Sequence, residues 1–226
     1  MSENVVEIRD GLNDNDRVEL TKLLVEKLQE LHSLTNATPL VRARLQMDVA
    51  EILVQLGRKT EAWTLAREAF DTALKDDAWQ DAVEACNVLF QCEQDDSVAA
   101  LGMGVWLAVS FPVDPELTLA MLQHIVDETP NHSDNAALAA VTARYVVDLR
   151  ADNESHESQS FFANNLIASV AERHSNVRNQ AALDKWMDML ELRDPEIFLP
   201  RMGRVVNAIV GDAWWFDREE LRKKLD

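Results

Sequence analysis

Turn-forming residues are scarce in this chain: its 226 residues include only six glycines and six prolines. A large β-protein needs many tight turns, which rely on these residues, whereas long helices with short connections need few. The segment 205–210 comes closest to a strand pattern, but it lies within a helical period. The composition therefore excludes a turn-rich β architecture and favours an all-α fold.

Cysteine is also rare, because only Cys86 and Cys92 are present. Six residues apart on one helix, they point about 120° away from each other. They therefore cannot bridge locally, and their spacing is not that of zinc ligands. We expect buried, reduced thiols in a cytoplasmic protein, and the N-terminus lacks the layout of a signal peptide.

Long apolar runs and positive charge are lacking as well. The longest apolar run, 98–113, is shorter than the ~20 residues of a membrane span and predicts a buried core helix. Lysine and arginine total 22 against 40 acidic residues, a formal net charge of −18. Nucleic acids and anionic membrane surfaces attract basic proteins. We therefore expect no nucleic-acid partner and no membrane insertion, and the charge serves either solubility or a basic protein partner.

Apolar residues recur at helical spacing along most of the chain and predict about eleven helices. Gly57 is expected to end one of them. Helix-start signals place a capping residue before a proline or an acidic residue: Thr38-Pro39, Asp114-Pro115-Glu116, Asp194-Pro195-Glu196, Asp16 with Glu19, and Asp217 with Glu220. We predict stacked antiparallel helical hairpins, forming either a superhelix or an irregular bundle.

The domain organisation follows from local polarity. Residues 1–15 are predicted to be a flexible N-terminus, followed by a helical-hairpin domain over 16–151. The polar, unpatterned stretch 152–158 is a predicted linker. Residues 159–226 form a C-terminal helical segment that we expect to pack on the first domain as one unit.

One part of the chain resembles a known family of helical repeats. The stretch Gln55-Leu56-Gly57-Arg58-Lys59-Thr60-Glu61-Ala62, followed by Ala66 and Ala69, resembles the turn and second helix of a tetratricopeptide repeat. Leu101-Gly102 and Pro130 are similar to that family's Leu-Gly pair and terminal proline. The resemblance covers residues 38–130 and implies repeat-like hairpins, although no regular period of about 34 residues is present.

No catalytic or metal-binding motif stands out. A carboxylate–histidine cluster that resembles a divalent-metal site comprises His124, Asp127, Glu128, His132 and Asp134, but His132 falls in a turn where exposed polar residues are expected. The Glu-x-x-His and His-Glu-x-x-His spacings are absent, as are a Gly-x-Ser-x-Gly elbow and a P-loop. We therefore predict no metal, no cofactor and no enzymatic activity.

Three consecutive aromatic residues, Trp214-Trp215-Phe216, stand at a predicted helix boundary. They cannot all face one core, and tryptophan is enriched at interface hot spots, so Trp214 and Trp215 are candidate partner-binding residues. In the competing interpretation the triplet pins the last helix to the body, with Phe216 in a hydrophobic staple.

Two functions remain open. The first is a scaffold or adaptor for protein–protein interaction that presents an acidic face to a basic partner or to itself. The alternative is a helical enzyme or small-molecule sensor with a pocket between helices in 97–150. That pocket would lie near Gly102 and Gly104, with His124 and Tyr145 nearby. The simpler interpretation of the two glycines is a close helix contact, at a cost of ~1 kcal/mol each relative to alanine.

Overall fold

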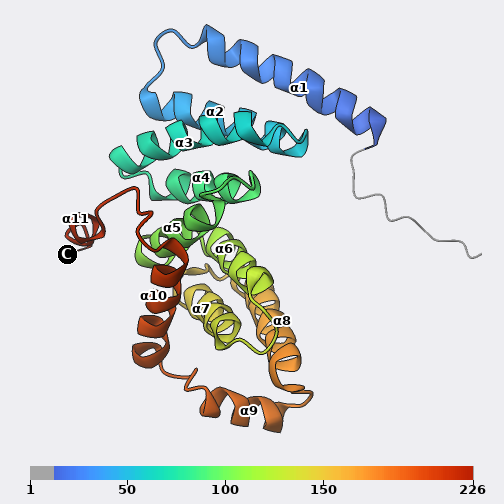
Figure 1. Cartoon of the computed structure of the whole chain (residues 1–226), viewed down its shortest axis with the longest axis vertical. Helices are drawn as coiled ribbons and strands as arrows, with labels where there is room; N and C mark the ends of the chain where they lie inside the picture. Colours follow the sequence, from blue (N-terminus) through green and yellow to red (C-terminus); the bar gives the residue numbers. More distant parts are fainter. Residues whose placement is uncertain (1–12, 226) are drawn as a thin grey trace, which may run out of the picture.

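The computed structural model describes residues 13–225 and confirms an all-α fold, with eleven helices and no strand in that range (Figure 1). The helices are α1 (Asp14–Ser33), α2 (Pro39–Gln55), α3 (Lys59–Lys75), α4 (Trp79–Gln91), α5 (Ser97–Ser110), α6 (Pro115–Glu128), α7 (Asp134–Arg150), α8 (His156–Ser175), α9 (Gln180–Met189), α10 (Pro195–Val210) and α11 (Arg218–Arg222). Most of the predicted flexible N-terminus, residues 1–12, lies outside the described residues.

Most of the predicted helix starts are confirmed. The side chains of Thr38, Asp114, Asp194 and Asp217 each accept a hydrogen bond from a backbone N–H in the first turn of the following helix. The predicted start at Asp16 is wrong. Asn13 is the cap of α1 because its side-chain oxygen accepts from the Asp16 amide at 2.9 Å.

The end of α2 is also as predicted. Gly57 adopts a positive φ of 77°, and the amide of Arg58 reaches back to the carbonyl of Leu53 at 2.8 Å. This is the hydrogen-bond pattern of a helix closed by a left-handed residue, which glycine adopts without steric strain. The chain then turns directly into α3.

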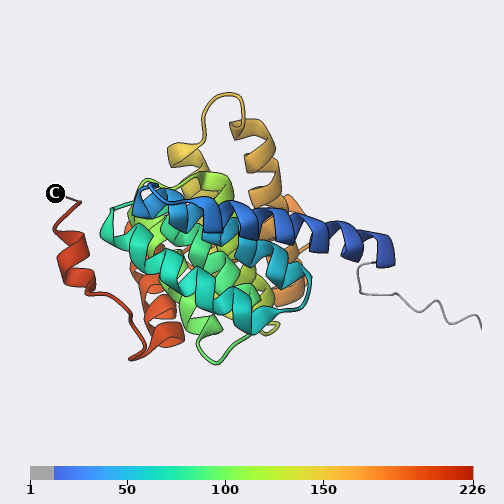
Figure 2. The same ribbon diagram turned by 90° about the horizontal axis from the view of Figure 1, so that it is seen from above.

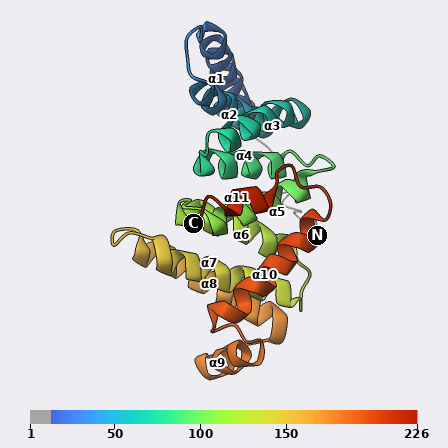
Figure 3. The same ribbon diagram turned by 90° about the vertical axis from the view of Figure 1, so that its left-hand side faces the viewer.

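Consecutive helices from α1 to α8 pack as neighbouring pairs, and α2, α4, α6 and α8 also touch one another in sequence. The chain then returns through α9, and α10 runs across α5 and α7 on the opposite side from that row (Figures 1 and 3). The C-terminal segment therefore packs directly on helices from the middle of the chain.

Helix α5 is the buried core helix that the apolar run predicts, since eleven of its fourteen residues are buried. Within residues 13–225, no helix has both the length and the apolar character needed to cross a membrane. The alanines of α7 permit close packing against its neighbours, because Ala136, Ala139 and Ala143 are almost completely buried.

Arginines of later helices donate to the free backbone carbonyls at the C-terminal ends of earlier ones. The guanidinium of Arg150, at the end of α7, donates to the carbonyls of Ala108 and Val109 of α5 at 2.6 and 2.7 Å. Arg173 of α8 donates to the carbonyl of Val126 of α6 at 2.6 Å. The last turn of a helix leaves such carbonyls without intrahelical partners, so these bonds tie alternate helices together.

The connection between α7 and α8 is shorter than the predicted linker, because α8 already begins at His156. The carboxylate of Asp152 accepts hydrogen bonds from the amides of Glu154 and Ser155 and from the Ser155 hydroxyl. These bonds hold the pKa of Asp152 below its usual value. The turn is thus ordered by its own side chains, and α7 packs directly against α8.

Candidate functional site

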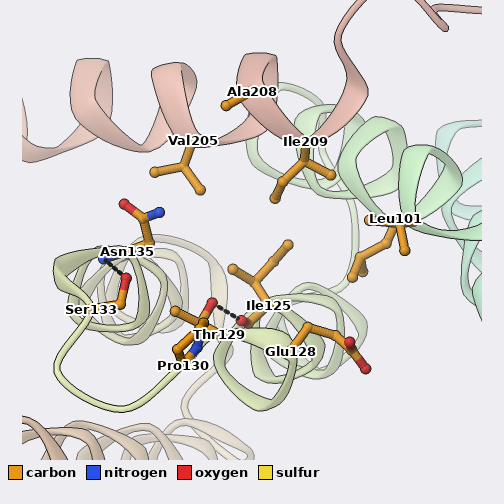
Figure 4. A pocket seen from close by; sticks show the side chains of 11 residues that line it. Leu101, Ile125, Glu128, Thr129, Pro130, Ser133, Asn135, Val205, Ala208 and Ile209 are labelled. Carbon is orange, nitrogen blue, oxygen red and sulfur yellow. Dashed lines mark hydrogen bonds between the residues drawn. The ribbon is translucent and has the colours of Figure 1, made fainter.

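A cleft of about 330 Å³ lies beneath α10. Helix α10 contacts both α5 and α7. Beneath α10, the space between α5 and α7 is open down to the C-terminal end of α6 (Figure 4). Four aliphatic side chains from three helices point toward one another across this space: Leu101 of α5, Ile125 of α6, and Val205 and Ile209 of α10. Val98 stands at the edge of the cleft and is 50% exposed, so the site is open to solvent.

Gly102 sets how closely α10 approaches α5. A Cβ atom on Gly102 would lie 2.5 Å from Cγ2 of Val210 and 2.9 Å from Cγ2 of Ile209, well inside contact distance. Gly104, on the same helix, lets α5 meet α4 and α6 equally closely. The simple interpretation of this glycine pair, close helix–helix contact, is therefore confirmed. The absence of a side chain at Gly102 allows the end of α10 to pack directly on α5, and this places Ile209 in the wall of the cleft.

The rim of the cleft is polar. Thr129 and Ser133 use their hydroxyl oxygens locally: Thr129 donates to the carbonyl of Ile125, and Ser133 caps α7 by accepting from the Asn135 amide. Within residues 13–225, the side chains of Glu128 and Asn135 make no hydrogen bond or ion pair, and both residues are exposed. They are the polar groups with which a bound molecule could bond.

This arrangement suits binding better than acid–base chemistry. Glu128 is the one titratable residue among those that line the cleft. General acid–base or nucleophilic catalysis needs a second group within hydrogen-bond reach of the first. What the cleft offers is a mostly apolar surface for an aliphatic or aromatic group, bordered by one carboxylate and one carboxamide.

Two residues, His124 and Tyr145, were expected near the pocket of the alternative function, but they lie elsewhere. His124 faces α4, where its Nε2 is 3.0 Å from the side-chain oxygen of Asn87 and its ring lies against Phe90. Burial lowers the pKa of His124, and the nearby carboxylates of Asp127 and Glu128 only partly oppose this effect. Tyr145 packs edge to face against Phe198. Neither side chain lines the cleft.

The aromatic triplet belongs to a C-terminal strap, defined as residues 211–225, that follows α10. Trp215 packs edge to face on Phe70 at 5.4 Å and on Trp63 at 6.0 Å between ring centroids, both on α3. The guanidinium of Arg67 lies 4.1 Å from the centroid of the Trp215 ring. The indole is therefore held between two aromatic edges and a cation.

Its neighbours in the strap contact α5. Trp214 lies 6.1 Å from Trp106 with nearly perpendicular rings, and Phe216 lies 5.6 Å from the same indole. Further along, α11 crosses beside α4 and α5, and Lys224 forms an ion pair with Asp77 (Figure 3). Trp214 and Trp215 are each only half-buried. These contacts are those of a segment pinned to the body, and a role in partner binding stays a prediction.

The histidines of the carboxylate–histidine group that resembles a metal site in the sequence point to other partners. His132 bonds through Nδ1 to the backbone carbonyl of His174 at 2.6 Å, and His124 faces away toward Asn87. Among residues 13–225, no group of three or more histidine, cysteine or acidic side chains is placed to hold a metal ion.

His174 is instead the centre of a polar cluster that joins α7, α8 and α9. Its Nε2 lies 3.1 Å from the carboxylate of Asp134, while its Nδ1 lies 2.6 Å from the hydroxyl of Ser175. This order resembles a catalytic triad. However, the indole N–H of Trp186 also points at Nδ1, at 3.2 Å. Because that indole can only donate, the lone pair of Nδ1 is already in use, and the cluster serves to join helices rather than to activate Ser175.

Both cysteines are buried, and burial raises the pKa of Cys86 far above its ordinary value and that of Cys92 to about 11, which disfavours the thiolate form that a nucleophile needs. Both are free thiols.

Comparisons with protein-family models, curated proteins and solved structures give no match.

The contribution of α10 to the cleft is not evident from the sequence. Gly102 signals that another helix approaches closely, but it does not identify α10, which begins more than ninety residues later, as that helix. The apolar periodicity of α10 predicts a buried face without predicting that part of that face remains open.

Proposed function

We propose that this chain is a non-enzymatic helical scaffold that binds a segment of another protein in the cleft beneath α10. The observation that carries this proposal is an open, apolar cleft between four helices whose rim presents Glu128 and Asn135 without partners in the described chain. The hairpin resemblance over residues 38–130 and the buried thiols are compatible with a cytoplasmic, repeat-like adaptor.

The chemistry of the cleft suggests what that segment carries. An aliphatic or aromatic side chain would occupy the space between Leu101, Ile125 and Ile209. The Asn135 carboxamide can donate to and accept from a peptide group, and Glu128 would pair with a lysine or arginine beside the inserted side chain. A chain with a net charge of −18 favours such a basic partner at longer range as well.

The test uses two valines that are equally exposed. Peptides would be selected from a displayed library on the full-length protein, and their affinities would be measured for Val98→Arg and for Val25→Arg. Both valines are 50% exposed, but Val25 lies on α1, far from the cleft in sequence and structure. Neither change buries a charge, so both variants should fold.

We expect Val98→Arg to weaken the selected peptides roughly tenfold or more, because the arginine would stand at the opening of the cleft and repel the cation that flanks the inserted side chain, and Val25→Arg to change affinity less than about twofold. Equal affinity for the two variants would refute the cleft as the binding site. Selected peptides that carry no apolar residue flanked by a cation would contradict the chemistry proposed for it.

The alternative, a small-molecule sensor, is favoured by one observation: the cleft volume falls at the lower end of the ~300–1,000 Å³ range of ligand pockets. Fragment screening by NMR distinguishes the two functions. A compound that binds saturably, shifts the resonances of Ile125 and Ile209 and loses binding in Val98→Arg, while no peptide competes with it, would establish the sensor instead.

A further inference from the structure

A second surface, unrelated to the cleft, lies on the outer side of α8. Phe161 and Phe162 are 62% and 61% exposed, and their rings contact each other edge to face at 5.9 Å. Adjacent phenylalanines rarely remain this exposed on a soluble domain, and grouped exposed apolar side chains are typical of an interaction site.

The pair is exposed because nothing in the described chain stacks on this part of α8. Ala163, Leu166 and Val170 face inward and are buried; Phe161 lies on the opposite side of the helix from them, and Phe162 lies at the edge of the buried face. The next helix, α9, has ten residues against the twenty of α8, and it faces only the C-terminal half, across a groove lined by Ala168 and Leu183. Figure 2 shows the α7–α8 turn projecting beyond the rest of the molecule.

The charge around the pair is mainly negative. From Ala151 to Glu172 the chain contains no lysine or arginine; Glu157, one turn before Phe161, and Glu154, in the turn that precedes α8, are exposed. Arg144 of the neighbouring α7 donates to Asn164 of α8, but its charge is paired with Asp148. A second copy of the chain would bring the same carboxylates and a further net charge of −18 to this surface. A second copy is therefore electrostatically disfavoured as the occupant, and so is an anionic membrane.

We propose that the N-terminal half of α8 docks a basic amphipathic helix of another protein. Such a helix would lie along α8 where another helix of the stack would otherwise pack, with its apolar stripe on Phe161 and Phe162. Its lysines or arginines would pair with Glu154 and Glu157, and an arginine could also lie over a phenylalanine ring. This surface does not depend on the cleft beneath α10.

The experiment compares two synthetic amphipathic helices that share one leucine stripe and differ only in carrying lysine or glutamate on the polar face. Binding of each labelled peptide to the full-length protein would be followed by fluorescence anisotropy. We expect the lysine peptide to bind and the glutamate peptide not to bind. The double variant Phe161→Ala/Phe162→Ala should bind the lysine peptide roughly 30-fold more weakly, the loss typical of interface hot spots.

The matched control is Val18→Ala/Val25→Ala, which removes two exposed apolar side chains of α1 and should change affinity by less than about twofold. Glu157→Lys should weaken binding and reduce its salt dependence. Val98→Arg should leave binding unchanged, which separates this proposal from that for the cleft. Both phenylalanines are exposed, so the double variant should keep the wild-type circular dichroism spectrum.

The proposal would be overturned if the lysine peptide did not bind, if it bound equally to the wild type and to the phenylalanine double variant, or if the two peptides bound equally well. A concentration-dependent dimer in sedimentation that the double variant abolishes would also overturn it, because a second copy would then cover the pair.

Discussion

Alanine substitutions at three helical glycines test whether α5 is packed as closely as its contacts indicate. A Cβ atom on Gly104 would lie 2.4 Å from the terminal methyl of Met121 and 2.6 Å from Cβ of Cys86. On Gly102 it would meet the branched side chains of Val210 and Ile209. Gly203 of α10 is the control, since a Cβ atom there meets nothing within 4 Å.

Two opposing effects set the magnitude. Replacing glycine by alanine inside a helix stabilises it by roughly 0.5–1 kcal/mol, whereas inserting an atom into a filled core costs roughly 1–3 kcal/mol. At Gly104 the methyl of Met121 can rotate away, but Cβ of Cys86 moves only with the backbone of α4. We therefore expect Gly104→Ala to destabilise the protein by about 2 kcal/mol. Gly102→Ala should cost about 1 kcal/mol, because α10 can shift outward.

Gly203→Ala should stabilise the protein by about 0.5–1 kcal/mol, because only the helix-propensity gain applies. Urea denaturation followed by circular dichroism measures all three, and for a chain of this size 1 kcal/mol corresponds to about 2–4 °C in Tm. The reasoning is refuted if Gly104→Ala is as stable as Gly203→Ala, since α5 would then have room that its contacts deny.

Four further outcomes follow from the contacts. Arg150→Met should destabilise the protein by about 1–3 kcal/mol in urea denaturation, because two part-buried carbonyls of α5 lose their donor; an unchanged midpoint would contradict that role. Burial holds the pKa of His124 below 6.5, so the unfolded chain takes up the proton first as pH falls. Stability should therefore decrease as pH drops below 6.5, and less so in His124→Gln; an identical slope in both proteins would show that this group does not contribute. The thiols of Cys86 and Cys92 should resist iodoacetamide at neutral pH and react only in denaturant, as mass spectrometry would show. Trp215→Ala should let trypsin cut within the C-terminal strap, after Arg218 and Arg222, before the rest of the chain is cut, and unchanged digestion would argue against the pinning interpretation.

The strap is joined to the helix that forms one wall of the cleft. The first residues of the strap follow α10 directly, and Trp214 and Phe216 pack the strap against Trp106 of α5. Because Val205 and Ile209 of α10 form one wall of the cleft, the strap helps to hold that wall in place. For variants of Trp214, Trp215 or Phe216, both the affinity for cleft-binding peptides and the free energy of unfolding should therefore be measured.

The helices and most of their ends were predictable from local sequence patterns. An apolar period of 3.6 residues and a capping side chain act within a few residues, so Thr38, Asp114 and Gly57 could be interpreted without tertiary information. The error at Asp16 is of the same local kind, since Asn13 competes for the same turn. The close contact at Gly102 was also predictable, because a glycine in a buried helix has few other uses.

Three features could not be predicted before the fold was known: the helix that meets Gly102, the place where the cleft opens, and the rings that contact Trp214 and Trp215. Each of these depends on α10 and the strap returning to α3 and α5 across the whole stack. Apolar periodicity predicts that one face of a helix is buried, but it does not predict which element covers that face, because the hydrophobic effect is non-directional. The exposure of Phe161 and Phe162 could not be predicted from the sequence either, because it depends on α9 being too short to cover them in the folded chain.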